Sequence, residues 1–485
     1  MGPSYARITA FDESHTKFAS KYSLYLYREQ GRDPLPDENE GFSHLGGIPI
    51  LFIPGNAGSY RQVRSIAAET SDLYFDHYLE SDDLNPNAKN YDFFTADFNE
   101  DFTAFHGRTM LDQAEYLNEA IKFILGLYAN SEHPPRSVVV LGHSMGGVVS
   151  RVMVSLPNYN PDSINTIITL ASPHAAAPLT FDGDILKIYS AVDRFWIQGY
   201  DNEETDNTIA KIAKERLSNI SVISITGGLL DTILPADYTT LGYLVPPTNG
   251  FTVYTTGIPG VWTPIDHLAI VWCAQLRRQV LKALLEIADF ESPDKTYSLD
   301  KRMKVLRKNF LSGFENYASQ DKVANDKTTN HIFLKAGSQQ INYVQEGQKL
   351  KVVPGKTPSP LNIFRSASPK RSKVQFSLLS SMKIGEHTSD VTEGYTQPTL
   401  LLCNTTDAIE EGVNIIDYTN EETTEIVLFN CIDISEDSSI IPRSADDTSS
   451  LSESSIGGEK SPYHAIQYNS TMIEPYDTLI VTGLL

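Results

Sequence analysis

The chain has 485 residues, which corresponds to two or three domains of ordinary size, and 41% of the residues are hydrophobic. This proportion is enough for a full hydrophobic core, so it excludes an intrinsically disordered chain. The formal net charge of -22 argues against a nucleic-acid-binding protein and against electrostatic attraction to anionic lipid.

The sequence offers no candidate for a membrane-spanning or secretory segment. No apolar run reaches 18 residues, so we expect no segment that crosses a bilayer. The first residues, MGPSYARITAFDESH, lack the charged and apolar regions of a signal peptide.

Residues 1–295 alternate predicted strands with predicted helices. This alternation predicts a mostly parallel sheet with helices on both faces. A segment at 173–219 interrupts the alternation, and it is either a cap over the carboxyl edge of the sheet, which we favour, or a crossover helix. The strands are expected at 47–55, 91–98, 138–142, 164–172, 220–228 and 251–260, and the helices at 109–128, 148–156 and 267–288.

The composition changes beyond residue 295. A connector at 296–327 contains a basic amphipathic helix, which is expected to pack on the preceding domain, the alternative being contact with a membrane surface. Short predicted strands separated by turns then fill 328–485 and predict an all-β sandwich. The polar, acidic, serine-rich stretch 435–460 predicts a disordered loop within that domain.

Cysteines and sequons bear on the compartment. Cys403 and Cys431 lie in strand-like apolar runs, so they either form a disulfide or are two buried free thiols. Asn219, Asn404 and Asn469 each begin an Asn-X-Ser/Thr sequon and are candidates for glycosylation in a secretory compartment.

The strongest chemical signal is the stretch VVVLGHSMGG at 138–147. It places Ser144 between Gly142 and Gly146, after a predicted strand and before a predicted helix. Such a turn exposes the serine hydroxyl above the sheet, and the helix N-terminus stabilises developing negative charge. We therefore predict an α/β-hydrolase fold with Ser144 as the nucleophile.

A serine nucleophile needs a base and an acid, which in this fold follow it in the order acid, then histidine. Asp231 and His267 come in that order in loops after predicted strands, and they are our candidates. Asp237 is the rival acid, and His174 is the rival base but precedes every plausible acid. His143 lies beside the nucleophile and is expected to point away from it.

The oxyanion formed during acyl transfer needs backbone N–H donors. One is expected from Met145, directly after the nucleophile, and the other from the loop IPGNAGSYRQ at 53–62, with Asn56 preferred and Ala57 the alternative. That loop lacks the Gly-Lys-Ser/Thr of a phosphate loop, which argues against a nucleotide site. No His/Cys cluster has metal-ligand spacing, so we expect neither a metal nor another cofactor.

Five stretches together resemble the eukaryotic GPI inositol-deacylase family, and the fungal members in particular. The β-rich remainder is similar to the lumenal β-sandwich of that family. The five stretches are LFIPGNAGSYRQVRSIA, DFNEDFTAFHGRTMLDQAEYLNEAI, VVVLGHSMGGVVSR, LASPHAAAP and IDHLAIVWCAQL.

The resemblance implies a serine hydrolase on the lumenal side of the endoplasmic reticulum membrane. Such enzymes remove the acyl chain from the inositol of GPI anchors on newly made proteins and aid their export to the Golgi. It matches Ser144 to the family's nucleophile and His267 to its histidine, and Asp231 stands where the acid is expected. Family members carry transmembrane helices, so this chain is expected to be a lumenal portion, with membrane association through segments that it lacks.

Three further expectations follow. The segment 173–219 and the early loops should shape an apolar slot for the acyl chain, with Phe195 and Trp196 as candidate lining residues. A general lipase or phospholipase with the same triad is one alternative function. A non-catalytic protein that binds GPI-anchored cargo and retains the fold is the other.

Overall fold

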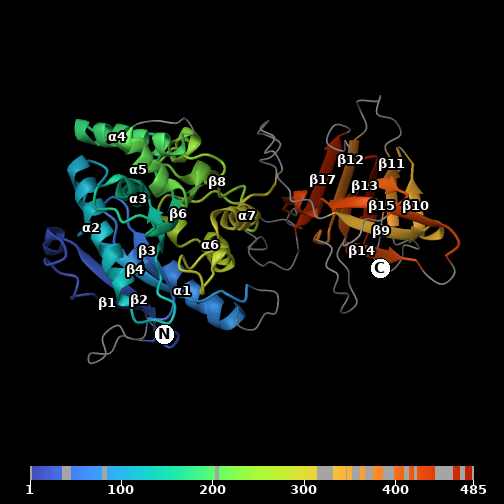
Figure 1. The fold of residues 1–485 in the computed structure, drawn as a ribbon. Helices are drawn as coiled ribbons and strands as arrows, with labels where there is room; N and C mark the ends of the chain where they lie inside the picture. Colours follow the sequence, from blue (N-terminus) through green and yellow to red (C-terminus); the bar gives the residue numbers. More distant parts are fainter. Residues whose placement is uncertain are drawn as a thin grey trace, which may run out of the picture. The chain divides into compact units, whose positions relative to one another are not determined.

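The computed structural model divides the chain into two compact units, Met1–Leu311 and Ser312–Leu485 (Figure 1). The division lies within the predicted connector at 296–327. The structure describes residues 3–34, 45–78, 85–201, 207–313, 331–345, 347–351, 361–365, 375–385, 398–408, 414–419, 423–442, 462–469 and 476–482.

The first unit is built on an eight-stranded sheet with the strand order β1-β2-β4-β3-β5-β6-β7-β8. Strands β3 to β8 run parallel to one another, and β1 and β2 extend the sheet antiparallel at one edge. The carboxyl ends of the parallel strands therefore meet at a single edge. The strands are β1 Pro3–Arg7, β2 Ser23–Glu29, β3 Ile48–Ile53, β4 Tyr91–Asp97, β5 Val138–His143, β6 Ile164–Leu170, β7 Ser221–Thr226 and β8 Gly250–Tyr254.

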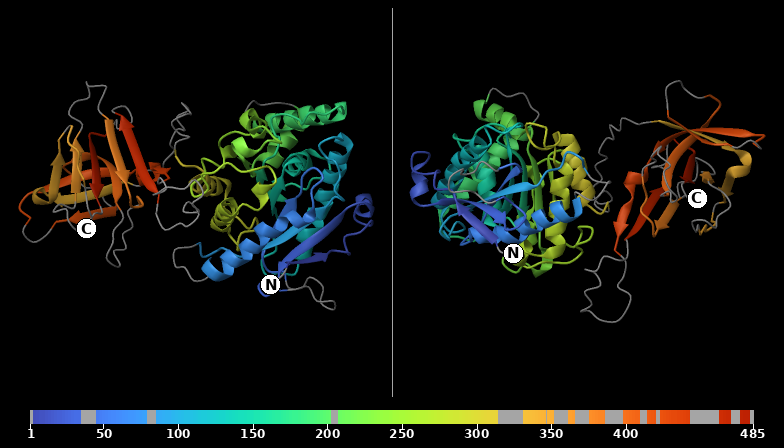
Figure 2. Two further views of the ribbon diagram at one scale, coloured as in Figure 1. Left: turned by 180° about the vertical axis from the view of Figure 1, so that it is seen from behind. Right: turned by 90° about the horizontal axis from the view of Figure 1, so that it is seen from below.

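Helices cover both faces of this sheet (Figure 2). One core cluster joins the sheet to α2, α3, α4 and α5, and a second joins the opposite face to α1, α6 and α7. This arrangement confirms the predicted α/β class with helices on both faces. No helix in the described ranges is long and apolar enough to cross a membrane. The helices are α1 Arg64–Asp72, α2 Gly107–Leu127, α3 Met145–Ser155, α4 Gly183–Tyr200, α5 Thr208–Leu217, α6 Ala274–Ile287 and α7 Leu299–Phe310.

The segment 173–219 contains α4 and α5, and α4 packs against α2 and α3 in one helical layer. Trp196 on α4 is fully buried, and its indole Nε1 donates a hydrogen bond to the carbonyl of Arg151 on α3 at 3.1 Å. Phe195 is buried in the same core cluster. The expectation that these two rings line an acyl slot is therefore wrong, because both complete the core between helices.

The basic helix beyond residue 295 is α7, and it packs on the first unit. Leu306 and Phe310 are fully buried in the core cluster of that face. Arg302 is also fully buried, and its guanidinium donates to the carbonyl oxygens of Asn165 at 3.1 Å, Asn219 at 2.5 Å and Tyr297 at 2.6 Å. Burial lowers the pKa of Arg302 to about 10. The guanidinium of Arg302 thus satisfies buried backbone carbonyls and does not face a lipid surface.

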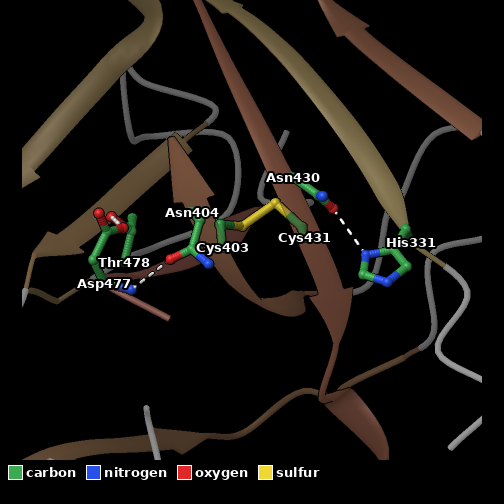
Figure 3. Close-up of a disulfide and its surroundings, with 7 residues drawn as sticks. All are labelled: His331, Cys403, Asn404, Asn430, Cys431, Asp477 and Thr478. Carbon is green, nitrogen blue, oxygen red and sulfur yellow. Dashed lines mark hydrogen bonds between the residues drawn. A yellow bond between two sulfur atoms is a disulfide. The ribbon is translucent and has the colours of Figure 1, made fainter. Parts of the chain in front are cut away.

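The three sequons differ in their surroundings. The Asn219 side chain donates from Nδ2 to Asp294 at 3.2 Å. Asn404 is half-buried and accepts a hydrogen bond from the backbone of Asp477 at 3.0 Å (Figure 3). Asn469 ends β17, and its side chain lies outside the described residues. Glycosylation of Asn219, Asn404 and Asn469 stays a prediction.

The second unit pairs a seven-stranded sheet, β10-β11-β18-β13-β15-β9-β14, with a three-stranded sheet, β12-β17-β16. Leu400 and Leu402 on β13 pack with Ile466 on β17, which joins the two sheets in one core cluster. This is the predicted all-β sandwich. Its strands are β9 Ile332–Gly337, β10 Ile341–Val344, β11 Leu361–Arg365, β12 Gln375–Ser380, β13 Thr399–Thr406, β14 Asn414–Tyr418, β15 Ile426–Asp433, β16 Ser439–Ile441, β17 Tyr463–Asn469 and β18 Thr478–Thr482.

Two sequence predictions are resolved in this unit. Cys403 and Cys431 lie directly opposite each other on β13 and β15 and form a disulfide (Figure 3). The loop expected at 435–460 does not begin at 435, because β16, Ser439–Ile441, pairs with β17. Residues 443–460 of that predicted loop lie outside the described residues.

Candidate active site

Ser144 lies at the carboxyl edge of the sheet, between the last residue of β5 and the first residue of α3. Its backbone has φ 52°, in the left-handed region that non-glycine residues rarely adopt. The backbone N–H of Ser144 donates to the carbonyl of Leu170 at 2.8 Å, which holds the turn in place. The strained turn presents the hydroxyl on a half-buried residue, as the Gly-x-Ser-x-Gly pattern predicts.

Glycines around the turn are required by close backbone contacts. A Cβ on Gly146 would lie 2.2 Å from the carbonyl oxygen of Ile53, at the end of β3. A Cβ on Gly142 would lie 2.7 Å from the backbone of the first turn of α3. On the facing loop, a Cβ on Gly55 would lie 2.7 Å from Cβ of Ser144. Because these positions lack a Cβ, the end of β3, the first turn of α3 and the loop after β3 can pack closely around the nucleophile.

Three predicted side chains meet at this edge. Nε2 of His267 lies 3.1 Å from Oγ of Ser144, and Nδ1 of His267 lies 2.8 Å from Oδ2 of Asp231. Asp231 is buried, and its Oδ1 accepts backbone N–H groups of Ile233 at 3.1 Å and Leu234 at 2.8 Å. The hydrogen bond to Asp231 orients the imidazole so that Nε2 can take a proton from the serine hydroxyl.

The alternative acid and the alternative base, Asp237 and His174, do not contact Ser144, Asp231 or His267 through any hydrogen bond among the described residues. Asp237 is exposed, and among the described residues it has no hydrogen bond to either histidine. His174 is fully buried, and its Nε2 is hydrogen-bonded to Oγ1 of Thr169 at 2.9 Å. The predicted helix at 267–288 begins only at Ala274, so His267 lies in a loop and not on a helix.

The structure separates the two candidates for the second oxyanion donor. The N–H of Ala57 donates to the carbonyl of Asp101 at 2.9 Å, so it is not available to an oxyanion. The N–H groups of Asn56 and Met145 have no hydrogen-bond acceptor among the described residues. The side chain of Asn56 also accepts the N–H of Ala104 at 2.9 Å, which ties the loop after β3 to the loop after β4.

Exposed apolar side chains gather on the loops that follow the parallel strands. We call this set the apolar rim. Where such side chains form a contiguous patch on a soluble domain, the patch marks contact with a protein, a membrane or an apolar ligand. The rim comprises Phe102 and Phe105 after β4, Leu179 and Phe181 after β6, Leu229, Leu230 and Ile233 after β7, and Leu268 and Trp272 after β8.

His143 makes a contact that no sequence signal revealed. It ends β5 and is buried, and its Nε2 lies 2.9 Å from the backbone carbonyl oxygen of His267. Burial lowers the pKa of His143 to about 4. Among the described residues the ring has no hydrogen bond to the serine hydroxyl, and it contacts instead the backbone of the residue whose imidazole contacts that hydroxyl.

The lowered pKa of His143 predicts a loss of stability in mild acid. An unfolded histidine titrates near 6.5, so between pH 6.5 and about 4 the unfolded chain binds the extra proton and the folded chain does not. The stability that the neutral His143 contributes is therefore fully present above pH 6.5 and is lost as the pH falls. At pH 5 the free energy of unfolding should be lower by about 2 kcal/mol. Chemical denaturation at pH 7.5 and pH 5 should show a smaller acid loss in His143→Gln than in the wild type. Equal losses in the two proteins would contradict it.

Two family models match this chain. A family model described as "PGAP1-like alpha/beta domain" matches residues 44–287. A second, described as "GPI inositol-deacylase beta-sandwich domain", matches residues 332–484. The first match lies within the α/β sheet unit and the second within the β-sandwich unit.

Curated relatives carry the same description. The chain is 86% identical to a GPI inositol-deacylase of Debaryomyces hansenii, over 100% of this chain and 47% of that protein. It is 46% identical to a GPI inositol-deacylase of Eremothecium gossypii, over 98% of this chain and 44% of that protein. A GPI inositol-deacylase of Kluyveromyces lactis is 57% identical over 67% of this chain and 33% of that protein. The chain thus spans about half the length, or less, of these relatives. From its two domain matches, the chain belongs to the PGAP1-like GPI inositol-deacylase family.

Proposed function

We propose that this chain forms the hydrolytic part of a serine esterase that removes the acyl chain from the inositol of GPI anchors. The observation that carries the proposal is the hydrogen-bonded series from Asp231 through His267 to Ser144. Membership of the inositol-deacylase family supports the substrate class.

The reaction is acyl transfer to the serine followed by hydrolysis. Nε2 of His267 takes the hydroxyl proton as Oγ of Ser144 attacks the ester carbonyl, and the imidazolium is stabilised by the Asp231 carboxylate. The backbone N–H groups of Met145 and Asn56 stabilise the oxyanion. His267 then protonates the departing inositol oxygen. Water, deprotonated by the same histidine, releases the fatty acid and restores the serine.

The apolar rim supports a lipid ester as the substrate. An acyl chain of a GPI anchor lies in a bilayer, and exposed phenylalanine and leucine side chains on the loops at the carboxyl edge of the sheet favour such surroundings. We place the reaction at the lumenal side of the endoplasmic reticulum membrane, with GPI-anchored proteins as substrates and membrane association through segments outside this chain. Removal of the inositol acyl chain there would aid export of these proteins to the Golgi.

A general lipase or phospholipase is the second candidate, since the same geometry cleaves any accessible ester. A cargo-binding protein without catalysis is disfavoured, because it has no need of three side chains in hydrogen-bond contact. Comparing substrates distinguishes the inositol deacylase from a general lipase. A serine variant distinguishes catalysis from binding alone.

The test measures release of free fatty acid from an inositol-acylated GPI in detergent, with wild type and Ser144→Ala side by side. We expect release by the wild type and a loss of at least about 10³-fold in the variant, because the nucleophile is removed. Phospholipid and triglyceride are measured in parallel. Faster release from either of these would favour the general lipase, and equal release by Ser144→Ala would exclude the proposed nucleophile.

A further inference from the structure

We propose that His143 is a positioning residue for the reaction, and that it fixes the backbone of His267 so that the imidazole stays between Ser144 and Asp231. The inference rests on the proposed esterase chemistry, because it assigns His143 a role through the base of that reaction. Within the described residues, the contact that carries it is the one from Nε2 of His143 to the carbonyl oxygen of His267, at 2.9 Å.

The contact defines the tautomer of His143. A backbone carbonyl only accepts hydrogen bonds, so Nε2 must carry the proton. Nδ1 of His143 is then the bare nitrogen, and it has no hydrogen-bond partner among the described residues. The ring is 2% exposed and therefore has no access to bulk water that would compete for the donor. One buried donor is thus committed to one carbonyl.

The base needs such an anchor because it lies in a loop. His267 precedes the first turn of α6 by several residues, and a loop constrains a side chain less than a helix does. The hydrogen bond to Asp231 orients the ring, but it does not fix the backbone from which the ring projects. The N–H of Ile265 donates to the carbonyl of Gly227 at 2.8 Å, and the contact from His143 adds a second anchor two residues later.

The anchor also couples the base to the nucleophile. His143 and Ser144 are consecutive residues, so the strand end that places the serine hydroxyl also places the donor that holds His267. A shift of β5 would move both partners of the proton transfer together. The distance from Oγ of Ser144 to Nε2 of His267 is therefore set from a single strand end.

The charge state of His143 suits this role. The two rings have centroids 5.2 Å apart, so an imidazolium at His143 would repel the imidazolium that forms at His267 during attack. Burial keeps the pKa of His143 at about 4, and the ring is neutral at neutral pH. The donor therefore holds the base without opposing its protonation.

The test compares two replacements of similar length. His143→Gln keeps an N–H donor near the position of Nε2, and His143→Met has none. Hydrolysis of a short p-nitrophenyl ester is measured per active site, with active sites counted by fluorophosphonate labelling of Ser144. We expect kcat to fall about 10- to 100-fold in the methionine variant, since a base misplaced by about 1 Å costs rates of this order. KM should change less than about two-fold, and glutamine should restore kcat to within about three-fold of wild type.

A matched control separates positioning from packing. His174→Met removes another fully buried imidazole, one that contacts Thr169 and not the base. It should lower the thermal midpoint without changing kcat per active site. Unchanged kcat in His143→Met, or an equal fall in the glutamine and methionine variants, would overturn the proposal.

The wild-type protein provides a test that needs no variant. Histidine-selective ¹⁵N NMR should show His143 as the Nε2–H tautomer, and the Nδ1–H tautomer would overturn the proposal. The ester and fluorophosphonate probes do not contain a GPI anchor. Failure to cleave GPI with normal reaction of these probes would therefore count against the proposed substrate and leave the test of His143 intact.

Discussion

Replacement of Asp231 by asparagine should lower kcat by roughly 10³- to 10⁴-fold with little change in folding. The amide keeps an oxygen that can accept the N–H groups of Ile233 and Leu234, so the loop retains its local hydrogen bonds. Its NH₂ group then faces Nδ1 of His267. That nitrogen must become an acceptor, which places the proton on Nε2, where the serine proton should be received.

The measurement is kcat for an ester substrate together with the thermal midpoint. Asp237→Asn serves as the control, because Asp237 is exposed and follows in the same loop region. It should retain wild-type kcat. A retained kcat in Asp231→Asn, or an equal loss in both variants, would show that the buried carboxylate does not set the tautomer of the base.

Gly146→Ala should nearly abolish reaction at Ser144 for a steric reason. Its Cβ would lie 2.2 Å from the carbonyl oxygen of Ile53 and 2.8 Å from that of Pro54. Both atoms are backbone, so α3 and the end of β3 must separate. Because β3 leads directly to Asn56, the separation displaces both proposed oxyanion donors. We expect a fall of about 100-fold in the fluorophosphonate labelling rate and a loss of about 1–3 kcal/mol in stability.

Gly126→Ala is the matched control for this substitution. Gly126 lies in α2, it is exposed, and a Cβ there would meet no atom within 4 Å. Alanine should stabilise the helix by about 0.5–1 kcal/mol and leave labelling unchanged. A labelling rate for Gly146→Ala within a few-fold of wild type would mean that the turn at Ser144 tolerates an extra methyl group.

Much of the fold and of the candidate site could be predicted because the patterns that specify them lie within short stretches of the sequence. A run of apolar residues followed by Gly-x-Ser-x-Gly specifies a strand, a tight turn and a helix within ten residues. The chain order then left His267 as the base and Asp231 as the acid, with Asp237 as its rival. The strands β1 and β2, which pair antiparallel at the edge of the sheet, were missed.

Other features depend on contacts that no pattern encodes. Apolar rings such as Phe195 and Trp196 have the same hydrophobicity in a slot as in a core, and the neighbouring helices decide between these. The choice between Asn56 and Ala57 follows from Asp101, a residue on another loop that takes the amide of Ala57. The role proposed for His143 rests on a carbonyl that is 124 residues away in the sequence.

Arg302 limits how far the α/β unit can be shortened at its carboxyl end. The alpha/beta family match ends at residue 287. The guanidinium that donates hydrogen bonds to the carbonyls of Asn165 and Asn219 belongs to α7, which lies beyond that residue. Those two carbonyls belong to the segments that lead into β7 and begin β6, the strands whose far ends carry the loops of the candidate site. A fragment that stops at the family boundary would leave buried acceptors without donors beneath the catalytic edge. We therefore expect that a fragment of the α/β unit must extend through α7, to about Leu311, to fold stably.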